Sequence, residues 1–128
     1  MDYEGYRDYH AVNLDAQTST ASPVQLMVLL MDGLLEEMAR ARAHIEQRRY
    51  EAKGRCVSKC IDILNGLSSS LDLDAGGEVA ENLARLYEYC ARRLNEAGLK
   101  LDVSLIDEVT RLMATIRGGW LGMQAAHG

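Results

Sequence analysis

A single proline is the strongest constraint on what this chain can fold into. It is the only proline among 128 residues, and it stands at position 23, directly after Ser22. Proline breaks a helix interior, but it suits the first helical position, where no amide hydrogen is needed. Ser22 can cap such a helix with its hydroxyl, and Gln25 can reach back to the cap amide to complete a capping box. The sequence therefore predicts a helix that starts at Pro23, and long uninterrupted helices after it.

The helix that starts at Pro23 carries more apolar residues than an ordinary amphipathic helix. Leucines at positions 26, 29, 30 and 34 share one stripe, and further apolar side chains spread beyond it at Met27, Val28, Met31 and Leu35. We expect this helix, at about 23–47, to be buried nearly all round or to keep a spare apolar face.

Three more stretches have the spacing of helices. Apolar residues recur at intervals of three and four over about 51–71, 78–97 and 103–117. The segment 72–77 is the clearest break, and Gly98 can supply the left-handed end of the third helix. Asp102 or Ser104 can cap the fourth helix. Four helices with short links predict an all-α, antiparallel, up-down-up-down four-helix bundle over 21–120.

The segments outside the bundle have less regular patterns. Residues 1–20 carry three tyrosines among charged residues and no long apolar stripe. Two interpretations stay open: a disordered tail, or a tail that docks as a cap through Tyr6, Tyr9, Val12 and Leu14. We expect residues 121–128 to form a flexible C-terminal tail after Gly118-Gly119.

Composition limits the partners. The net charge is −5, so the chain has no basic footprint for nucleic acid or an anionic membrane surface. The longest apolar run is 26–31, far below the roughly 20 residues that span a bilayer. Three cysteines without a signal segment favour a reduced cytosolic setting over a disulfide framework.

No pattern of catalytic or metal-binding residues stands out. Cys56 and Cys60 are one helical turn apart and Cys90 is on another helix, so they do not form the tight pairs of a zinc site. The residue three before His44 is Ala41, which excludes the Glu-x-x-His motif of di-iron bundles. We therefore expect no enzyme, no metal and no cofactor. What remains is a protein-binding surface, to which six methionines can contribute adaptable contacts.

Three blocks of the sequence carry a family likeness. Thr20 to Gly33 resembles the Thr-Ala-Ser-Pro start and the Leu-Tyr-Asp-Gly motif of FliS, the bacterial flagellin-specific export chaperone family, with Met31 where the family usually has tyrosine. Gly76 to Leu94 is similar to the family's third helix, and Glu108 to Trp120 is similar to its fourth. The likeness covers about 6–120.

This resemblance implies a function. It predicts a cytosolic bundle that binds the disordered C-terminal segment of flagellin, prevents premature polymerisation, and assists delivery to a gate component of the flagellar type III export apparatus. It also implies that the N-terminal tail covers the apolar surface when no client is bound. We expect the flagellin groove or tail cap to involve Tyr6, Tyr9, Val12, Met27, Val28, Met31, Leu64, Leu67, Leu71, Leu83 and Tyr87. The competing interpretation is a non-catalytic dimerisation or adaptor module, in which the wide face of the first helix pairs with a second copy.

Overall fold

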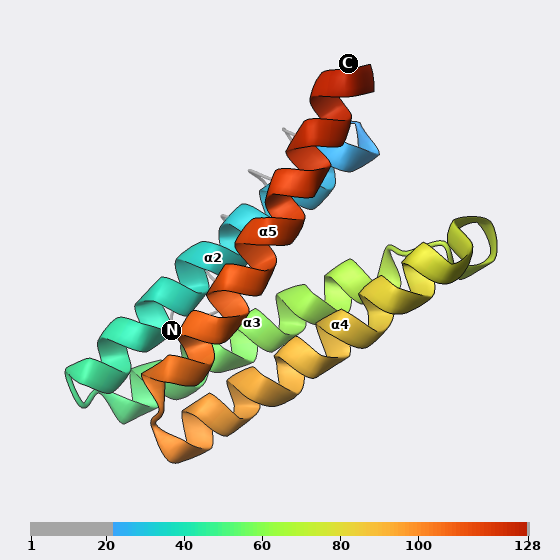
Figure 1. Cartoon of the computed structure of the whole chain (residues 1–128). Helices are drawn as coiled ribbons and strands as arrows, with labels where there is room; N and C mark the ends of the chain where they lie inside the picture. Colours follow the sequence, from blue (N-terminus) through green and yellow to red (C-terminus); the bar gives the residue numbers. More distant parts are fainter. Residues whose placement is uncertain (1–21, 128) are drawn as a thin grey trace.

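The computed structural model describes residues 22–127, with side chains described up to residue 122. Within this range the chain forms four helices and no strand (Figure 1). They are α2 (Pro23–Glu46), α3 (Tyr50–Ser69), α4 (Leu73–Lys100) and α5 (Val103–His127). The predicted all-α class is confirmed.

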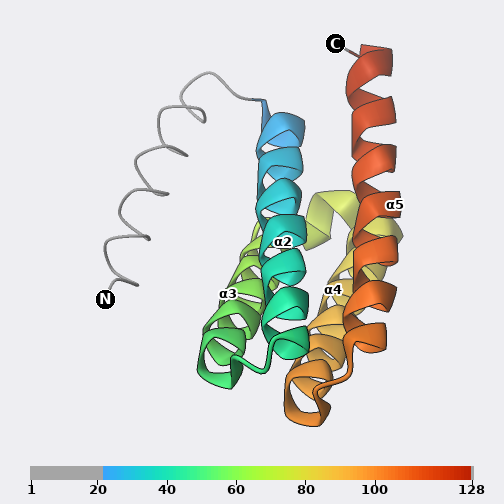
Figure 2. The same cartoon turned by 90° about the vertical axis from the view of Figure 1, so that its left-hand side faces the viewer.

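The four helices form a ring in which each helix packs on its neighbours. The main contacts join α2 to α3, α3 to α4, α4 to α5, and α5 back to α2. Successive helices run in opposite directions, because the links at 47–49, 70–72 and 101–102 are too short for any other arrangement (Figures 1 and 2). The predicted antiparallel bundle is confirmed. The predicted cap, at 1–20, lies outside the described residues and stays a prediction.

The start of α2 matches its predicted capping box. The Ser22 hydroxyl accepts a hydrogen bond from the Gln25 amide at 3.1 Å, and the Ser22 amide donates to Gln25 Oε1 at 2.7 Å. Two amides at the helix start thus have partners, and Pro23 needs none.

Large apolar side chains from all four helices meet along the axis of the bundle. The fully buried ones include Met31, Leu34, Met38, Leu64, Leu67, Tyr87, Leu94, Ile106, Val109 and Met113. In α2 this shifts the predicted stripe, since Met31 is in the core while Leu26, Leu29 and Leu30 are half-buried. The expectation that Met31 belongs to a spare face is wrong for this conformation.

The predicted break at 72–77 is a kink inside α4. The helix begins at Leu73, where Asp72 Oδ1 accepts from the Ala75 amide at 3.0 Å, and not near Glu78 as expected. Gly77 has φ 56° and ψ −134°, a backbone conformation that only glycine adopts readily. This one residue interrupts the helical backbone between a first turn at 73–76 and the long helix that continues from Glu78, so a break does lie within the predicted segment.

The end of α4 also differs from the prediction. Gly98 is helical and buried, and a β-carbon there would lie 3.5 Å from Val57. Lys53 Nζ donates to the Gly98 carbonyl at 2.9 Å. The left-handed residue is Leu101, with φ 55°. Gly98 thus lies inside α4 at its contact with α3, and the expected helix end near 97 is wrong.

The last helix is longer than the sequence indicates. Asp102 Oδ1 accepts from the Ser104 amide at 2.9 Å, as predicted for a cap. The helix then passes through Gly118-Gly119 to His127, beyond the expected end near 117. Glycine lowers helix propensity by about 1 kcal/mol but leaves helical backbone accessible. Ile116 and Trp120 pack on the core on both sides of the glycine pair.

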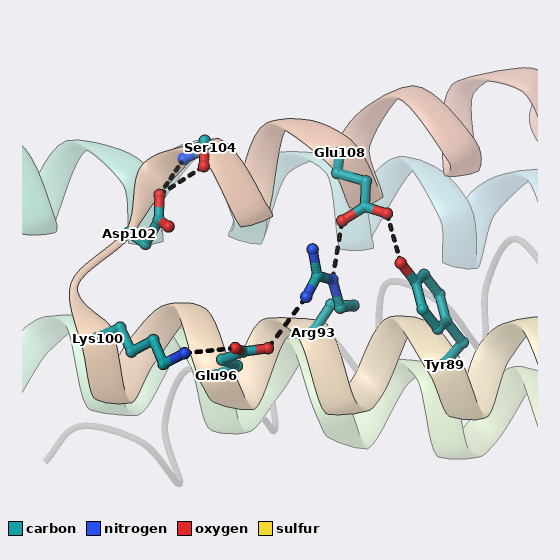
Figure 3. Close-up of polar contacts among 7 residues, drawn as sticks. All are labelled: Tyr89, Arg93, Glu96, Lys100, Asp102, Ser104 and Glu108. Carbon is teal, nitrogen blue, oxygen red and sulfur yellow. Dashed lines mark hydrogen bonds and ion pairs between the residues drawn. The ribbon is translucent and has the colours of Figure 1, made fainter.

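Polar contacts close the outer side of the bundle between α4 and α5 (Figure 3). Glu108 accepts from the Tyr89 hydroxyl at 2.5 Å and from Arg93 Nε at 2.9 Å. Arg93 also contacts Glu96, which pairs with Lys100 at 2.8 Å. The Tyr89 and Arg93 donors lower the pKa of Glu108, so this cluster favours the ionised carboxylate.

Candidate functional site

An open apolar groove lies at the end of the bundle where α2 begins. Its volume is about 370 Å³. All four helices or their links contribute to its lining, and we call this set the groove: Pro23, Val24, Met27, Ser70, Leu71, Asp72, Ala75, Gly76, Val79, Ala80, Leu83 and Trp120. Only Ser70 and Asp72 bring polar side chains, so the groove suits apolar side chains of a peptide rather than a charged small molecule.

The first turns of α2 and the α3–α4 link form one wall. The capping box fixes where α2 starts and thereby sets the position of Pro23 and Val24. Ser70 Oγ lies 3.5 Å from the Met27 sulfur, which joins the link to α2. Because Met27 is flexible and half-buried, this wall can adapt to differently shaped side chains.

The kinked start of α4 forms the opposite wall. A β-carbon on Gly76 would lie 2.6 Å from that of Ala80, which is closer than real side chains approach. Gly77 supplies the bend that directs this turn. Beyond the kink, Val79 is 68% exposed although it lines the groove. An exposed apolar side chain in a concave apolar site is typical of a binding surface.

Trp120 forms the part of the groove that α5 contributes, and Tyr87 lies next to it in the core. Burial raises the pKa of Tyr87, and the neighbouring Trp120 indole opposes this rise. Neither the Tyr87 hydroxyl nor Trp120 Nε1 makes a well-formed hydrogen bond within the described structure, and both atoms are buried. Trp120 therefore rests on Tyr87 through packing, without a strong polar contact to fix it.

The described part of the chain offers little support for metal binding, reactive cysteines or membrane insertion. No group of three or more His, Cys, Asp or Glu side chains there is placed to hold a metal ion. The thiols of Cys56, Cys60 and Cys90 are buried, and burial raises the pKa of Cys90 to about 11. No helix within 22–127 has the length and apolar character needed to cross a membrane.

Comparison with known proteins identifies the family. The sequence model described as "Flagellar protein FliS" matches residues 5–127. The chain belongs to the FliS family. The likeness seen in the sequence motifs is thereby confirmed.

Curated FliS proteins are similar along most of their length. The flagellar secretion chaperone FliSB of Pseudomonas aeruginosa is 44% identical over 117 residues, which cover 91% of this chain and 93% of the relative. The flagellar secretion chaperone FliS of Salmonella typhimurium is 42% identical, covering 91% and 87%. The FliS protein of Escherichia coli is 37% identical, with coverage of 91% and 87%.

The structure divides the site residues predicted from the FliS likeness into four groups. Three of them line the groove: Met27, Leu71 and Leu83. Four lie in the core, at most 1% exposed, so that a partner could touch them only if helices separated: Met31, Leu64, Leu67 and Tyr87. Val28 is half-buried on α2 and is not part of the groove, while Tyr6, Tyr9 and Val12 lie outside the described residues.

Several groove residues of this FliS chain escaped sequence reasoning. Val24, Val79 and Trp120 line the groove, yet the predicted site omitted them. The groove residues 72, 75, 76, 79, 80 and 83, on α4 and its N-cap, recur in the sequence at intervals of three and four, and this helical spacing was the available signal. This spacing led to no prediction, because Gly76-Gly77 indicated a loop.

Proposed function

We propose that this FliS chain is a cytosolic export chaperone for flagellin. It binds the disordered C-terminal segment of flagellin, prevents premature polymerisation, and assists delivery to a gate component of the flagellar type III export apparatus. The curated relatives are named flagellar secretion chaperones. The observation that carries the proposal is the apolar groove with the exposed Val79 on its wall. The role is one of binding, without a catalytic step.

The physics of such a client explains why the site is apolar and open. A disordered segment gains free energy by burying apolar side chains, but ordering it costs roughly 2 to 5 kcal/mol. A groove of about 370 Å³ accepts only a few side chains, so the client must continue over further surface of the bundle. Many shallow contacts then act together, and the complex can still release its client.

The N-terminal tail competes with the client in this proposal. The tail joins the bundle at Ser22, beside the groove residues Pro23 and Val24. Docking of Tyr6, Tyr9 and Val12 on the apolar surface would lower the apparent client affinity in proportion to the fraction of molecules left open. Deletion of residues 1–14 should therefore tighten client binding and increase binding of an apolar dye. Unchanged values for both would refute the cap.

Isothermal titration with a peptide of the flagellin C-terminal segment tests the main proposal. The unaltered chain should bind the peptide one to one. Val79→Glu places a charge in the groove at an exposed position, so it should weaken binding about tenfold or more, equivalent to 1.4 kcal/mol or above, with little loss of stability. Leu99→Glu is the matched control, because Leu99 is an exposed apolar residue at the other end of the same helix.

Two outcomes would contradict the proposal. Equal affinities for Val79→Glu and Leu99→Glu would mean that the groove does not bind the client. A chain that ignores the peptide and forms a stable dimer in light scattering would instead fit the dimerisation module.

A further inference from the structure

A second unpartnered surface lies at the end of the bundle opposite the groove. The links at 47–49 and 101–102 both lie at this end (Figures 1 and 2). The hydrogen bond of Lys53 to the Gly98 carbonyl joins the first turns of α3 to the last turn of α4. We call the exposed residues of this end the link-end surface: Arg48, Arg49, Tyr50, Leu99 and Leu101.

Two residues of the link-end surface adopt a backbone conformation that favours glycine. Arg48 has φ 59° and Leu101 has φ 55°, and they are the only non-glycine residues with positive φ within 22–127. A β-carbon makes this conformation unfavourable, so glycine would reduce the strain in both links. Both side chains are exposed. Core packing therefore does not account for the presence of arginine and leucine at these positions.

Three of the six large apolar side chains that are exposed among the described residues belong to the link-end surface. Leu99 is 79% exposed, Tyr50 is 47% exposed and Leu101 is 39% exposed. Tyrosine and arginine are the residue types that most often dominate protein interfaces. Exposed apolar side chains next to arginines are thus typical of a docking site.

The charge of the link-end surface is positive, although the chain has a net charge of −5. The nearby carboxylates already have partners, since Glu46 pairs with Arg42 at 2.9 Å and Glu96 pairs with Lys100 at 2.8 Å. Glu51 lies 3.5 Å from Arg55. Arg48 and Arg49 make no ion pair with any described residue, and their guanidinium groups are available for carboxylates of a partner.

We propose that the link-end surface is a second docking site, which takes an acidic segment with apolar side chains from a partner protein. Arg48 and Arg49 contact its carboxylates, while Tyr50, Leu99 and Leu101 contact its apolar side chains. The chain's own N-terminal segment, which also carries acidic and aromatic residues, is the competing occupant: markedly tighter peptide binding after removal of residues 1–14 would identify that segment instead of a partner. Since the two sites lie at opposite ends, a second protein can hold the chain while the groove is occupied.

Fluorescence anisotropy with a labelled peptide of the repeat Glu-Leu-Glu-Ser tests this proposal on the full chain. The unaltered chain should bind this peptide more tightly than peptides in which Lys replaces Glu or Ser replaces Leu, and salt should weaken the binding. Arg48→Gly and Leu101→Gly should each reduce affinity about tenfold, while their Tm values stay equal or rise because the links lose strain. If Arg48 and Leu101 served only to stabilise the fold, both glycine variants would have a lower Tm than the unaltered chain.

Val79→Glu serves as the matched control and should keep full affinity for the acidic peptide. If Val79→Glu abolishes flagellin binding and Arg48→Gly does not, the two sites are independent, and one proposal can fail without the other. Equal binding of all three peptides, or unchanged affinity of both glycine variants, would overturn the second site. Binding of phosphatidylglycerol vesicles in place of the peptide would also overturn it, as would self-association that Arg48→Gly removes.

Discussion

At the scale of single residues, burial separates the side chains that hold the bundle from those that a client can reach. Leu67 is fully buried between helices, whereas Leu83 is half-buried in the groove. Leu67→Ala should lower the free energy of unfolding by about 2 to 5 kcal/mol, because it leaves a cavity in the core. Urea unfolding measures this loss, and titration should find flagellin-peptide affinity unchanged below the transition.

Leu83→Ala is the comparison for Leu67→Ala. It should reduce stability less and peptide affinity more, because part of its surface faces the groove. A stable Leu67→Ala variant with weakened binding would place the client contact in the core, and the groove assignment would then be wrong.

The ion pair between Arg42 and Asp107 gives a testable pH dependence. Arg42 donates to both Asp107 oxygens, at 2.9 Å and 3.2 Å, and these hydrogen bonds lower the pKa of Asp107. A carboxyl whose pKa is lower in the folded state stabilises the fold above its unfolded pKa of about 3.9, and this contribution is lost as the pH falls through the folded pKa.

Asp107→Asn should therefore destabilise the bundle at neutral pH and should match the unaltered chain in strong acid. Urea midpoints measured between neutral pH and strong acid give this difference. Asp74→Asn, which alters an exposed aspartate of α4, is the control. A difference that persists unchanged in strong acid would show that the substitution acts through packing and not through the ion pair.

Sequence reasoning at this scale succeeded where the chemistry is local. Ser22 and Gln25 are three residues apart, and Asp102 caps the helix that begins right after it, so neighbouring residues alone determine both caps. The left-handed Leu101 was missed, because glycine at position 98 is the commoner terminator and nothing local indicates that Gly98 packs against Val57. Tertiary contact decided that position.

At the scale of helices, the glycines of α4 and α5 should respond to substitution in opposite ways. Gly77→Ala forces a β-carbon onto a strained backbone and should cost about 1 to 3 kcal/mol. Gly119 lies within α5, and nothing is within 4 Å of a β-carbon placed there. Gly119→Ala should therefore stabilise the protein by up to about 1 kcal/mol.

Thermal unfolding followed by circular dichroism at 222 nm, a helix signal, compares the two glycine variants. Opposite shifts in Tm support the kink at Gly77 and the continuous helix through Gly119. A stabilised Gly77→Ala would mean that α4 runs straight, and the groove wall would then need a different shape.

Predictions for whole helices failed where tertiary packing overrides local preference. The segment 72–77 has the composition of a turn, yet five of its residues belong to α4 because a single glycine absorbs the bend. Gly118-Gly119 weakens a helix, yet packing of Ile116 and Trp120 carries α5 across it. Because three groove residues lie in 72–76, misplacing the start of α4 also hid one wall of the site.

At the scale of the whole molecule, the cysteines should report how often the bundle opens. Cys56, Cys60 and Cys90 are buried, and burial raises the pKa of each thiol. A thiol reagent should leave the folded chain almost unmodified at pH 8, because the reagent cannot reach the buried cysteines and few of their thiols are deprotonated. Guanidinium-unfolded protein should react at all three cysteines.

Labelling of the folded chain should slow further when the flagellin peptide binds, since a ligand of the folded state lowers the open fraction. Mass spectrometry of the labelled protein gives the rate for each cysteine. Rapid reaction of one cysteine in the folded chain would reveal local opening of its helix, and the bundle would then not open as a unit.

For the molecule as a whole, the fold class and the family followed from the sequence, and the groove did not. Helical periodicity identifies the apolar face of each helix, and short links determine their order. Periodicity cannot say which turns of a helix another helix covers, so Met31 was expected on a spare apolar face and Val79 was left out of the predicted site. The groove forms from residues up to 97 positions apart, between Pro23 and Trp120, and only the assembled bundle brings them together.

The position of Trp120 on the last helix also affects the timing of assembly during synthesis. A chain leaves the ribosome from its N-terminus, so α2, α3 and α4 are made before α5. Until α5 arrives, its apolar residues Ile106, Val109 and Met113 are missing from the core, and the groove lacks its Trp120 side. If the groove captures the client as proposed, a nascent chain cannot yet bind it, and binding competence begins only when the fourth helix has docked.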